Sequence, residues 1–429
     1  MLDSTIIHNA DLSVSLMAEN LIGSEIIKLA GEISEKIKKG ERIFNYTIGD
    51  FDPNIFPIPQ ELTDAIIAAY QEHHTNYPMA SGMPELRKAV SSLLKDRLQL
   101  NYSPDEILIA GGARPLIYGT YVTLLNAGDT VVFPVPSWNN NHYCHLTQSI
   151  PVIVETKAEN NFMPTAAEIK PHLKNATLLS LCSPLNPTGT IFQKEQLESI
   201  CDLVLEENKR RGSDGKPLYL MYDQIYWVLT FGNNQHYNPV SLRPEMRDYT
   251  IFIDGVSKSL AATGIRVGWA FGPKRIMDKM KAILSHIGAW SPKAEQVATA
   301  RYLQMKPEMS TFVTDFKKRV NQRLEKFYEG FVQLKNEGYK VDAIAPQAAI
   351  YLTVQLKLAG MKTTNGKVLT HQKDVTQYIL DEAKLALVPF SAFGSSDDSS
   401  WYRLSVGTCN SGEIVEVFTS LRSVLSKLS

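Results

Sequence analysis

Residues 254–273 read DGVSKSLAATGIRVGWAFGP, a stretch that contains a lone lysine among small residues. Lys258 follows the apolar run TIFIDG (250–255), and Arg266 stands eight positions further on. Most lysines lie on the solvated protein surface. A lysine in a partly desolvated pocket near other cations instead loses its proton more readily and can attack a carbonyl carbon. Lys258 is therefore either a surface residue or a nucleophile, and its neighbours in the fold decide between the two.

Strand-like apolar runs alternate with helical patterns around this stretch. The runs are short, and each ends in small or polar residues: EILIAGG (106–112), TVVFPVP (130–136), TLLSLCSP (177–184), LYLMYD (218–223) and TIFIDG (250–255). Such alternation is typical of an α/β fold in which helices cover both faces of a mostly parallel sheet. We predict that fold class for the centre of the chain.

The two ends of the chain depart from this pattern. After the last of these runs, long helical patterns dominate, and IYLTVQL and YRLSVGT supply further strands. The proline-rich segment IFNYTIGDFDPNIFPIP (43–59) is typical of a crossing between two lobes. We predict a large domain over residues 50–300 and a smaller α+β domain built from residues 1–49 and 301–429.

The composition argues against several classes of protein. Of the 429 residues, 44% are hydrophobic and 21% charged, and the formal net charge is −1. No global field therefore recruits nucleic acid or an anionic membrane. The four cysteines form no C-x-x-C pair, which argues against a disulfide framework or a structural zinc site. The N-terminus lacks a secretory pattern, and no apolar run reaches the roughly 18–20 residues of a transmembrane helix. We expect a cytoplasmic protein without a metal site.

Polar residues and glycines stand at the ends of the predicted strands. Asp223 closes LYLMYD, Asn186 follows TLLSLCSP, and Lys258 follows TIFIDG. The pair Gly111–Gly112 ends EILIAGG, and Trp138 follows TVVFPVP. In parallel α/β sheets, ligands bind beyond the carboxyl ends of the strands. We expect these residues to form a single site.

The residue types at this edge suit a phosphorylated carbonyl cofactor with a basic ring nitrogen. A glycine turn before a helix offers backbone N–H groups to a phosphate, and the Arg266 guanidinium binds oxyanions. The Asp223 carboxylate can pair with a cationic ring nitrogen, and Lys258 can bond to an aldehyde. Taken singly, these features are also explained by a tight turn, a surface ion pair, a helix cap and a solvated lysine. Together they predict pyridoxal 5'-phosphate, an electron sink for carbanions.

The lysine stretch also resembles a known family. GVSKSLAATGIRVG is similar to the cofactor-lysine segment of the class I/II aminotransferases, pyridoxal-phosphate-dependent enzymes of fold type I. Four further segments resemble that family in the expected order: NYPMASGMPELRKAV (76–90), SPLNPTGTIF (183–192), YDQIY (222–226) and YRLSVGT (402–408). Together they cover most of residues 45–410, so the chain is identified as a member of the family.

The resemblance implies a role for each matching residue around the cofactor ring. Lys258 would bond to the cofactor and, once freed by the amino-acid substrate, would carry the substrate Cα proton to the cofactor. Asp223 would keep the ring nitrogen protonated. The other ring contacts would come from Asn186 and Tyr226 at the phenolic oxygen and from Trp138 on the ring face.

Contacts for the phosphate and the substrate follow from the same resemblance. The phosphate would be bound by Arg266, Ser257 and the backbone amides of Ala113 and Arg114. Tyr77 would reach the phosphate of the neighbouring subunit's cofactor, which makes a homodimer the expected active unit. The substrate α-carboxylate would be bound by Arg403, with Gly49 and Asn186 beside it.

Three positions depart from the family pattern. Many members carry a serine three residues before the lysine, where this chain has Gly255. Arg114 stands where serine, threonine or glutamine is common, and Lys293 in SPKAEQ replaces a small or hydroxyl residue. Arg114 could replace the lost phosphate contact, and both cations are candidates for binding a second, distal substrate carboxylate. The alternative for each is a solvated surface cation.

We therefore expect an aminotransferase that moves an amino group from an L-amino acid to a 2-oxo acid by ping-pong half-reactions. The two cationic candidates favour an acidic donor such as aspartate or glutamate, and Trp138 resembles the ring-stacking tryptophan of aspartate aminotransferases. An aromatic aminotransferase and a β-lyase on the same scaffold remain alternatives, because the fold does not fix the chemistry. The expected partners are small amino and 2-oxo acids and a second copy of the chain.

Overall fold

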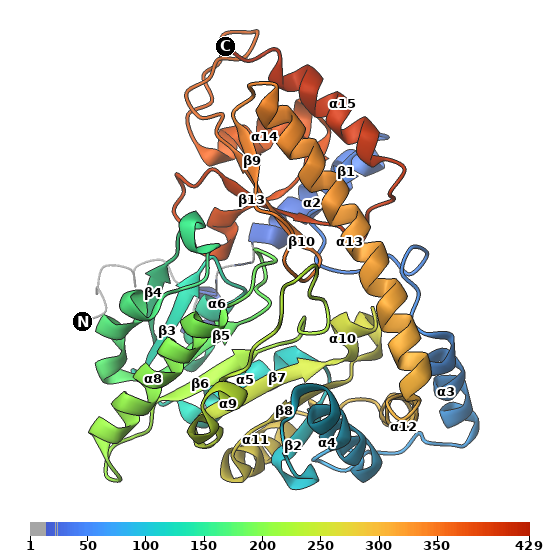
Figure 1. The fold of residues 1–429 in the computed structure, drawn as a ribbon, viewed down its shortest axis with the longest axis vertical. Helices are drawn as coiled ribbons and strands as arrows, with labels where there is room; N and C mark the ends of the chain where they lie inside the picture. Colours follow the sequence, from blue (N-terminus) through green and yellow to red (C-terminus); the bar gives the residue numbers. More distant parts are fainter. Residues whose placement is uncertain (1–13, 22, 24) are drawn as a thin grey trace.

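A seven-stranded sheet forms the centre of the computed structural model, which describes residues 14–21, 23 and 25–429 (Figure 1). The strand order is β2-β8-β7-β6-β5-β3-β4. Neighbours from β7 to β4 pair in parallel, whereas β8 runs antiparallel to both β2 and β7. The strands are β2 (Ile107–Ala110), β3 (Thr130–Val135), β4 (Ile150–Glu155), β5 (Ala176–Cys182), β6 (Tyr219–Asp223), β7 (Thr250–Gly255) and β8 (Gly268–Phe271). The predicted α/β class with a mostly parallel sheet is confirmed.

Helices bury both faces of this sheet. Successive side chains of a strand point to opposite faces, so in β2 Ile107 and Ile109 join one core and Leu108 and Ala110 join another. Burial on both sides explains why these strands read as unbroken apolar runs. The first core includes α4 (Pro84–Leu98), α8 (Lys194–Arg211) and α12 (Lys293–Tyr302), and the second includes α5 (Ala113–Leu124), α6 (Asn140–Thr147) and α11 (Lys274–His286).

A separate hydrophobic core lies around a smaller antiparallel sheet of order β12-β13-β10-β9. The two-residue strand β1 (Phe44–Asn45) pairs with β11 (Leu385–Ala386), which brings the segment before residue 50 beside the C-terminal part of the chain. The elements of this region are β9 (Val341–Ala343), β10 (Tyr351–Leu356), α14 (Gln372–Glu382), β12 (Val388–Pro389), β13 (Trp401–Ser405) and α15 (Ile414–Leu425).

One long helix, α13 (Lys306–Asn336), connects the two regions, as Figure 1 shows. Its residue Val313 packs in the core of the large sheet, whereas Phe316 and the residues that follow it pack in the core of the smaller sheet. The division into domains at residues 50 and 300 stays a prediction.

The remaining helices are short or peripheral. They are α1 (Leu16–Glu19), α2 (Glu25–Lys38), α3 (Gln60–Gln71), α7 (Ala166–Ile169), α9 (Pro239–Leu242) and α10 (Val256–Ser259). No helix in the described ranges is long and apolar enough to cross a membrane. The expectation of no secretory signal rests on the N-terminal residues, of which 1–13 lie outside the described part of the chain.

Two strands of the large sheet, β4 and β8, were not among the apolar runs that the sequence predicted. The burial or the length of each strand explains why. β4 lies at the outer edge of the sheet, and most of its side chains are exposed or half-buried. An edge strand of that kind needs no continuous apolar run. β8 has only four residues, GWAF, inside the lysine stretch itself. Because β8 pairs with β7, this hairpin fixes the turn that carries Lys258.

Candidate active site

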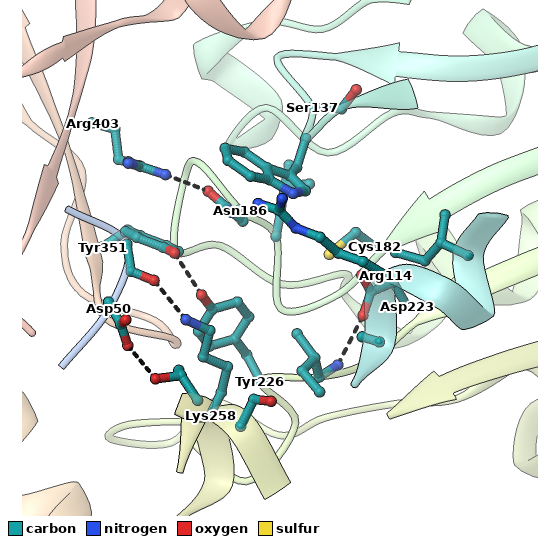
Figure 2. A pocket seen from close by; sticks show the side chains of 18 of the residues that line it. Asp50, Arg114, Ser137, Cys182, Asn186, Asp223, Tyr226, Lys258, Tyr351 and Arg403 are labelled. Atoms are coloured by element: carbon teal, nitrogen blue, oxygen red, sulfur yellow. Dashed lines mark hydrogen bonds between the residues drawn. The ribbon is translucent and has the colours of Figure 1, made fainter. Parts of the chain in front are cut away.

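A cavity of about 680 Å³ lies at the carboxyl ends of β3, β5, β6 and β7 (Figure 2). The smaller sheet contributes Tyr351 and Arg403 to its wall, and the crossing segment contributes Thr47, Gly49 and Asp50. Of the residues to which the family resemblance assigns a role, all except Tyr77 line this cavity: Gly49, Ala113, Arg114, Trp138, Asn186, Asp223, Tyr226, Ser257, Lys258, Arg266 and Arg403. The topology therefore brings these residues together from positions far apart in the sequence.

Lys258 points into this cavity rather than to the solvated surface. β7 ends at Gly255, and the lysine follows in the single turn of α10. Its Nζ donates a hydrogen bond of 2.5 Å to the Gly49 carbonyl oxygen. Burial lowers the pKa of Lys258 to about 8, the Asp50 carboxylate opposes this effect, and the arginines of the cavity add to it. A buried amine with a lowered pKa is able to act as a nucleophile.

Gly255 has a structural reason to lack a side chain. A Cβ atom at this position would lie 2.8 Å from the Val267 carbonyl oxygen and 2.9 Å from the Gly268 Cα. Both atoms belong to the backbone of β8 or the residue before it, so neither can turn aside. The serine that many family members carry here would not fit this hairpin without a backbone shift.

Asp223 ends β6 as a carboxylate in need of a cation. Its Oδ1 accepts a hydrogen bond of 3.0 Å from the Ile225 backbone N–H, and burial raises the pKa of Asp223 to about 6. Among the described residues, no lysine, arginine or histidine forms an ion pair with it. His142 on α6 forms no hydrogen bond with Asp223 among the described residues. A cationic ligand atom would stabilise the charged form of this carboxyl.

Arg403 is held on two sides. Arg403 is only 1% exposed. Its Nη1 donates a hydrogen bond of 2.9 Å to Asn186 Oδ1, and its Nη2 donates one of 2.6 Å to the Thr47 carbonyl oxygen. The buried Nε has no hydrogen-bond partner among the described residues. At Gly49 a Cβ atom would lie 2.8 Å from the Tyr351 hydroxyl and 3.5 Å from Arg403 Nη1. The close approach of these groups explains why this position is a glycine.

Two hydroxyls meet near Lys258. The Tyr226 and Tyr351 hydroxyl oxygens lie 2.5 Å apart, and the rings are packed edge to face. Tyr351 and Asp50 also line the cavity, although the sequence pattern predicts neither of them. Tyr351 lies within a strand, and Asp50 lies within an irregular segment, so neither follows an α/β strand end.

The glycine turn before α5 forms a cradle beside Arg266. Gly112 has φ +95°, and a Cβ atom there would overlap the Arg266 guanidinium. The guanidinium donates a hydrogen bond of 2.8 Å to the Gly111 carbonyl oxygen and one of 2.7 Å to the Thr263 carbonyl oxygen. The helix begins at Ala113 without a side-chain cap, which leaves its first N–H groups available to an anion.

Arg114 lies over the face of Trp138, with its guanidinium carbon 5.3 Å from the ring centroid. Its side chain makes no hydrogen bond or ion pair with any other described residue. The loop that carries Trp138 is fixed by neighbours, because Asn140 Nδ2 donates 3.0 Å to Ser137 Oγ and Tyr121 donates 2.9 Å to Asn140 Oδ1. Arg114 is thus a cation in the cavity that is oriented by stacking and available to a ligand.

Tyr77 and Lys293 lie elsewhere. Both line a second cleft of about 530 Å³ beside Trp290. Tyr77 is 83% exposed and packs edge-on against Trp290, and Lys293 Nζ donates 2.5 Å to Asn76 Oδ1. Within one copy of the chain, neither residue reaches the Lys258 cavity. No group of three or more His, Cys, Asp or Glu residues in the described ranges is arranged to hold a metal ion.

A family model described as "Aminotransferase class I and II" matches residues 43–421. This chain belongs to that family. The aspartate aminotransferases of Bacillus sp. (strain YM-2) and Geobacillus stearothermophilus are 30% and 31% identical to it. The matched regions cover 91% and 88% of this chain and 93% and 91% of those proteins. The chain is therefore an aminotransferase.

Solved structures place this aminotransferase in fold type I. The aspartate aminotransferase from Rhizobium meliloti has a TM-score of 0.88 at 25% identity and covers 97% of this chain and 99% of its own. The aromatic aminotransferase from Pyrococcus horikoshii OT3 has a TM-score of 0.80 at 25% identity, covering 92% and 98%. Both comparisons extend over more than nine tenths of this chain.

The class I/II aminotransferase family implies pyridoxal 5'-phosphate as the cofactor, and the cavity fits this group. A basic ring nitrogen would supply the cation that buried Asp223 lacks. The cradle at Gly112, the uncapped start of α5 and Arg266 suit a phosphate. Lys258 has a depressed pKa and suits an aldehyde. The donor set therefore matches each end of the cofactor.

Proposed function

We propose that this aminotransferase transfers the amino group of an acidic L-amino acid, such as aspartate or glutamate, to a 2-oxo acid in two half-reactions. The observation that carries the proposal is the pair of guanidinium groups in the cavity. Arg403 is buried and held by two hydrogen bonds, and Arg114 is stacked on Trp138 without an ionic partner. A dicarboxylate has one charged group for each arginine.

The cofactor would be held at both ends by residues of the cavity. Arg266, Ser257 and the N-terminus of α5 at Ala113 and Arg114 would bind its phosphate. Asp223 would pair with its ring nitrogen, and Asn186 and Tyr226 would contact its phenolic oxygen beside Trp138. When bound, pyridoxal 5'-phosphate supplies an electron sink for the carbanion at the substrate Cα.

The protein's own groups would then bind the substrate and move its proton. Arg403 would hold the α-carboxylate beside Gly49 and Asn186, which orients the Cα–H bond toward Lys258. The Lys258 amine, with a pKa near 8, would accept the Cα proton and deliver it to the cofactor carbon on the other side of the transferred nitrogen. A base of this strength is well matched to neutral solution, where such proton transfer contributes about 10²–10⁴-fold.

A homodimer would be the working unit, with Tyr77 reaching the partner's cofactor phosphate. The exposure of Tyr77, at 83%, supports a role toward a neighbouring chain rather than within its own cavity. The two relatives from Bacillus sp. and Geobacillus stearothermophilus are both named aspartate aminotransferase, which supports the acidic donor. A cytoplasmic location stays a prediction from the sequence.

An absorbance experiment tests the reaction and its donor together. The purified protein is loaded with pyridoxal 5'-phosphate and mixed with aspartate, glutamate and phenylalanine in turn, with Lys258→Ala as the control. We expect the acidic donors to convert the visible cofactor band to the pyridoxamine form at a higher rate than phenylalanine. Preference for phenylalanine would favour an aromatic aminotransferase. Release of pyruvate and ammonia from a β-substituted amino acid would favour a β-lyase.

A further inference from the structure

The crossing segment at residues 49–51 makes two separate contacts with the lysine turn. Lys258 Nζ donates 2.5 Å to the Gly49 carbonyl oxygen, and Thr263 Oγ1 donates 2.7 Å to Asp50 Oδ1. Lys258 and Asp50 both line the cavity, and Figure 2 shows the hydrogen bond that Asp50 accepts. The contacts join residues 209 and 213 positions apart. The position of the free lysine side chain is therefore set by a segment outside the large sheet.

Asp50 is itself held in one orientation. Besides the bond from Thr263, its Oδ1 accepts a hydrogen bond of 2.8 Å from the Phe51 backbone N–H. Thr263 is fixed in turn, because its carbonyl oxygen accepts 2.7 Å from Arg266 Nη1. The Lys258 Nζ lies over the rings of Phe51 and Tyr226, 5.7 Å from each centroid. These contacts leave Lys258 a defined resting place.

The charged groups around Lys258 are mostly cations, and Asp50 is an anion among them. Arg114 on α5, Arg266 after α10 and Arg403 on β13 face Lys258 with like charge, and Tyr226 and Tyr351 face it with hydroxyls. Among the described residues, the carboxylates that line this cavity are Asp50 and Asp223. Since Asp223 would pair with the cofactor ring, Asp50 is the carboxylate left for the lysine.

We propose that Asp50 is a positioning residue that holds the released Lys258 amine at the Gly49 carbonyl, ready to accept the Cα proton. The proposal rests on the proposed function, because an amine-transfer cycle frees this lysine in every turnover. Its contacts are this chain's own and do not depend on which amino acid is the donor. Asp50 balances the desolvation of the lysine, so the amine stays both charged at rest and able to lose its proton near neutral pH.

Asp50→Asn tests this role because it keeps the shape and removes the charge. The first readout is the pH dependence of the rate at which pyridoxal 5'-phosphate joins the cofactor-free protein, which reports the ionisation of Lys258. We expect the apparent pKa to fall by about one unit in Asp50→Asn and less in Asp50→Glu, since the charge that raises it is gone. Asp52→Asn is the matched control, because Asp52 lies two residues away, bonds to Asn54 and does not line the cavity.

The second readout is the half-reaction with aspartate in a single turnover. We expect the first-order rate constant of Asp50→Asn to fall at least about tenfold while the substrate dissociation constant changes less than threefold. Thr263→Val, which removes the donor but keeps the carboxylate, should lower the rate constant with a smaller pKa change. If Asp50→Asn does not fold, Thr263→Val and Asp50→Glu carry the test.

The proposal is overturned if Asp50→Asn matches Asp52→Asn in both readouts. A lowered Lys258 pKa with an unchanged half-reaction rate constant in Asp50→Asn would also overturn the proposal. The Asp50 carboxylate would then stabilise the charged form of Lys258 without positioning its amine. The pH dependence of pyridoxal 5'-phosphate association is measured without any amino-acid substrate. Failure of the acidic-donor proposal would therefore leave this readout intact, and an unshifted profile would reject the role of Asp50 with any donor.

Discussion

Arg403 Nη1 donates a hydrogen bond of 2.9 Å to Asn186 Oδ1, joining β13 of the smaller sheet to the loop after β5 of the large one. The second guanidinium nitrogen of Arg403 donates to Thr47 in the crossing segment. One buried side chain thus ties three parts of the chain together at the edge of the cavity. Its orientation depends on a planar group with several donors.

Arg403→Lys should therefore be damaging although it keeps the charge. A single ammonium cannot reproduce both hydrogen bonds and still bind a carboxylate in two places. We expect kcat/KM for the amino-acid donor to fall at least about a hundredfold, which corresponds to ~2.7 kcal/mol of transition-state stabilisation. The affinity for pyridoxal 5'-phosphate, measured by titration, should change little. Wild-type kcat/KM in Arg403→Lys would contradict the assignment of the α-carboxylate to this arginine.

Asp223→Asn should separate stability from function. Burial raises the pKa of Asp223 to about 6 from the ordinary 3.8, so the folded protein holds this proton more tightly than the unfolded chain does. The contribution of the carboxyl to stability is therefore full below about pH 4 and is lost as the pH rises to about 6. In the cofactor-free protein at pH 7.5, we expect Asp223→Asn to raise the melting temperature while amine transfer is lost.

Melting curves at two pH values check this sign. The difference in melting temperature between Asp223→Asn and the natural chain should shrink toward zero near pH 4, where both side chains are neutral. An equal difference at both pH values would mean that the substitution acts through packing rather than through charge. Weaker binding of pyridoxal 5'-phosphate by the variant is expected, because the ring nitrogen loses its anionic partner.

Gly255→Ser should destabilise the hairpin of β7 and β8. The added Cβ would lie 2.8 Å from the Val267 carbonyl oxygen, so the backbone must shift. We expect a loss of about 1–3 kcal/mol in the free energy of unfolding, measured by chemical denaturation of the cofactor-free protein. Gly31→Ser is the control, because a Cβ at Gly31 meets nothing within 4 Å. Tighter binding of the cofactor by Gly255→Ser would show that the hairpin accommodates the family's serine after all.

The sequence predicted the part of the fold whose signal is local. Strands such as β5 and β6 are buried on both faces and read as apolar runs, and the residues that end them lie at one edge of the sheet. The exposed edge strand β4 carries no such run. Tyr351 and Asp50 reach the cavity through pairings with Tyr226 and Thr263 that span 125 and 213 positions, and no local pattern encodes contacts of that kind.

The sequence did not decide whether Arg114 or Lys293 binds the distal substrate carboxylate. Substituting each residue in turn tests which of them does. Arg114 lies in the Lys258 cavity over Trp138, whereas Lys293 bonds to Asn76 in the second cleft. We expect Arg114→Gln to lower kcat/KM for aspartate about 10–100-fold, the range of a lost charge-assisted hydrogen bond, and to leave phenylalanine nearly unchanged.

The affinity for pyridoxal 5'-phosphate, measured in the same preparations, separates the two possible partners of Arg114. Unchanged cofactor affinity with lost preference for aspartate would assign its side chain to the distal carboxylate. Weaker cofactor binding with equal losses for aspartate and phenylalanine would assign it to the phosphate instead. Lys293→Gln should resemble the natural chain in all three measurements; a selective loss of aspartate turnover there would move the distal carboxylate to a cation supplied across a dimer.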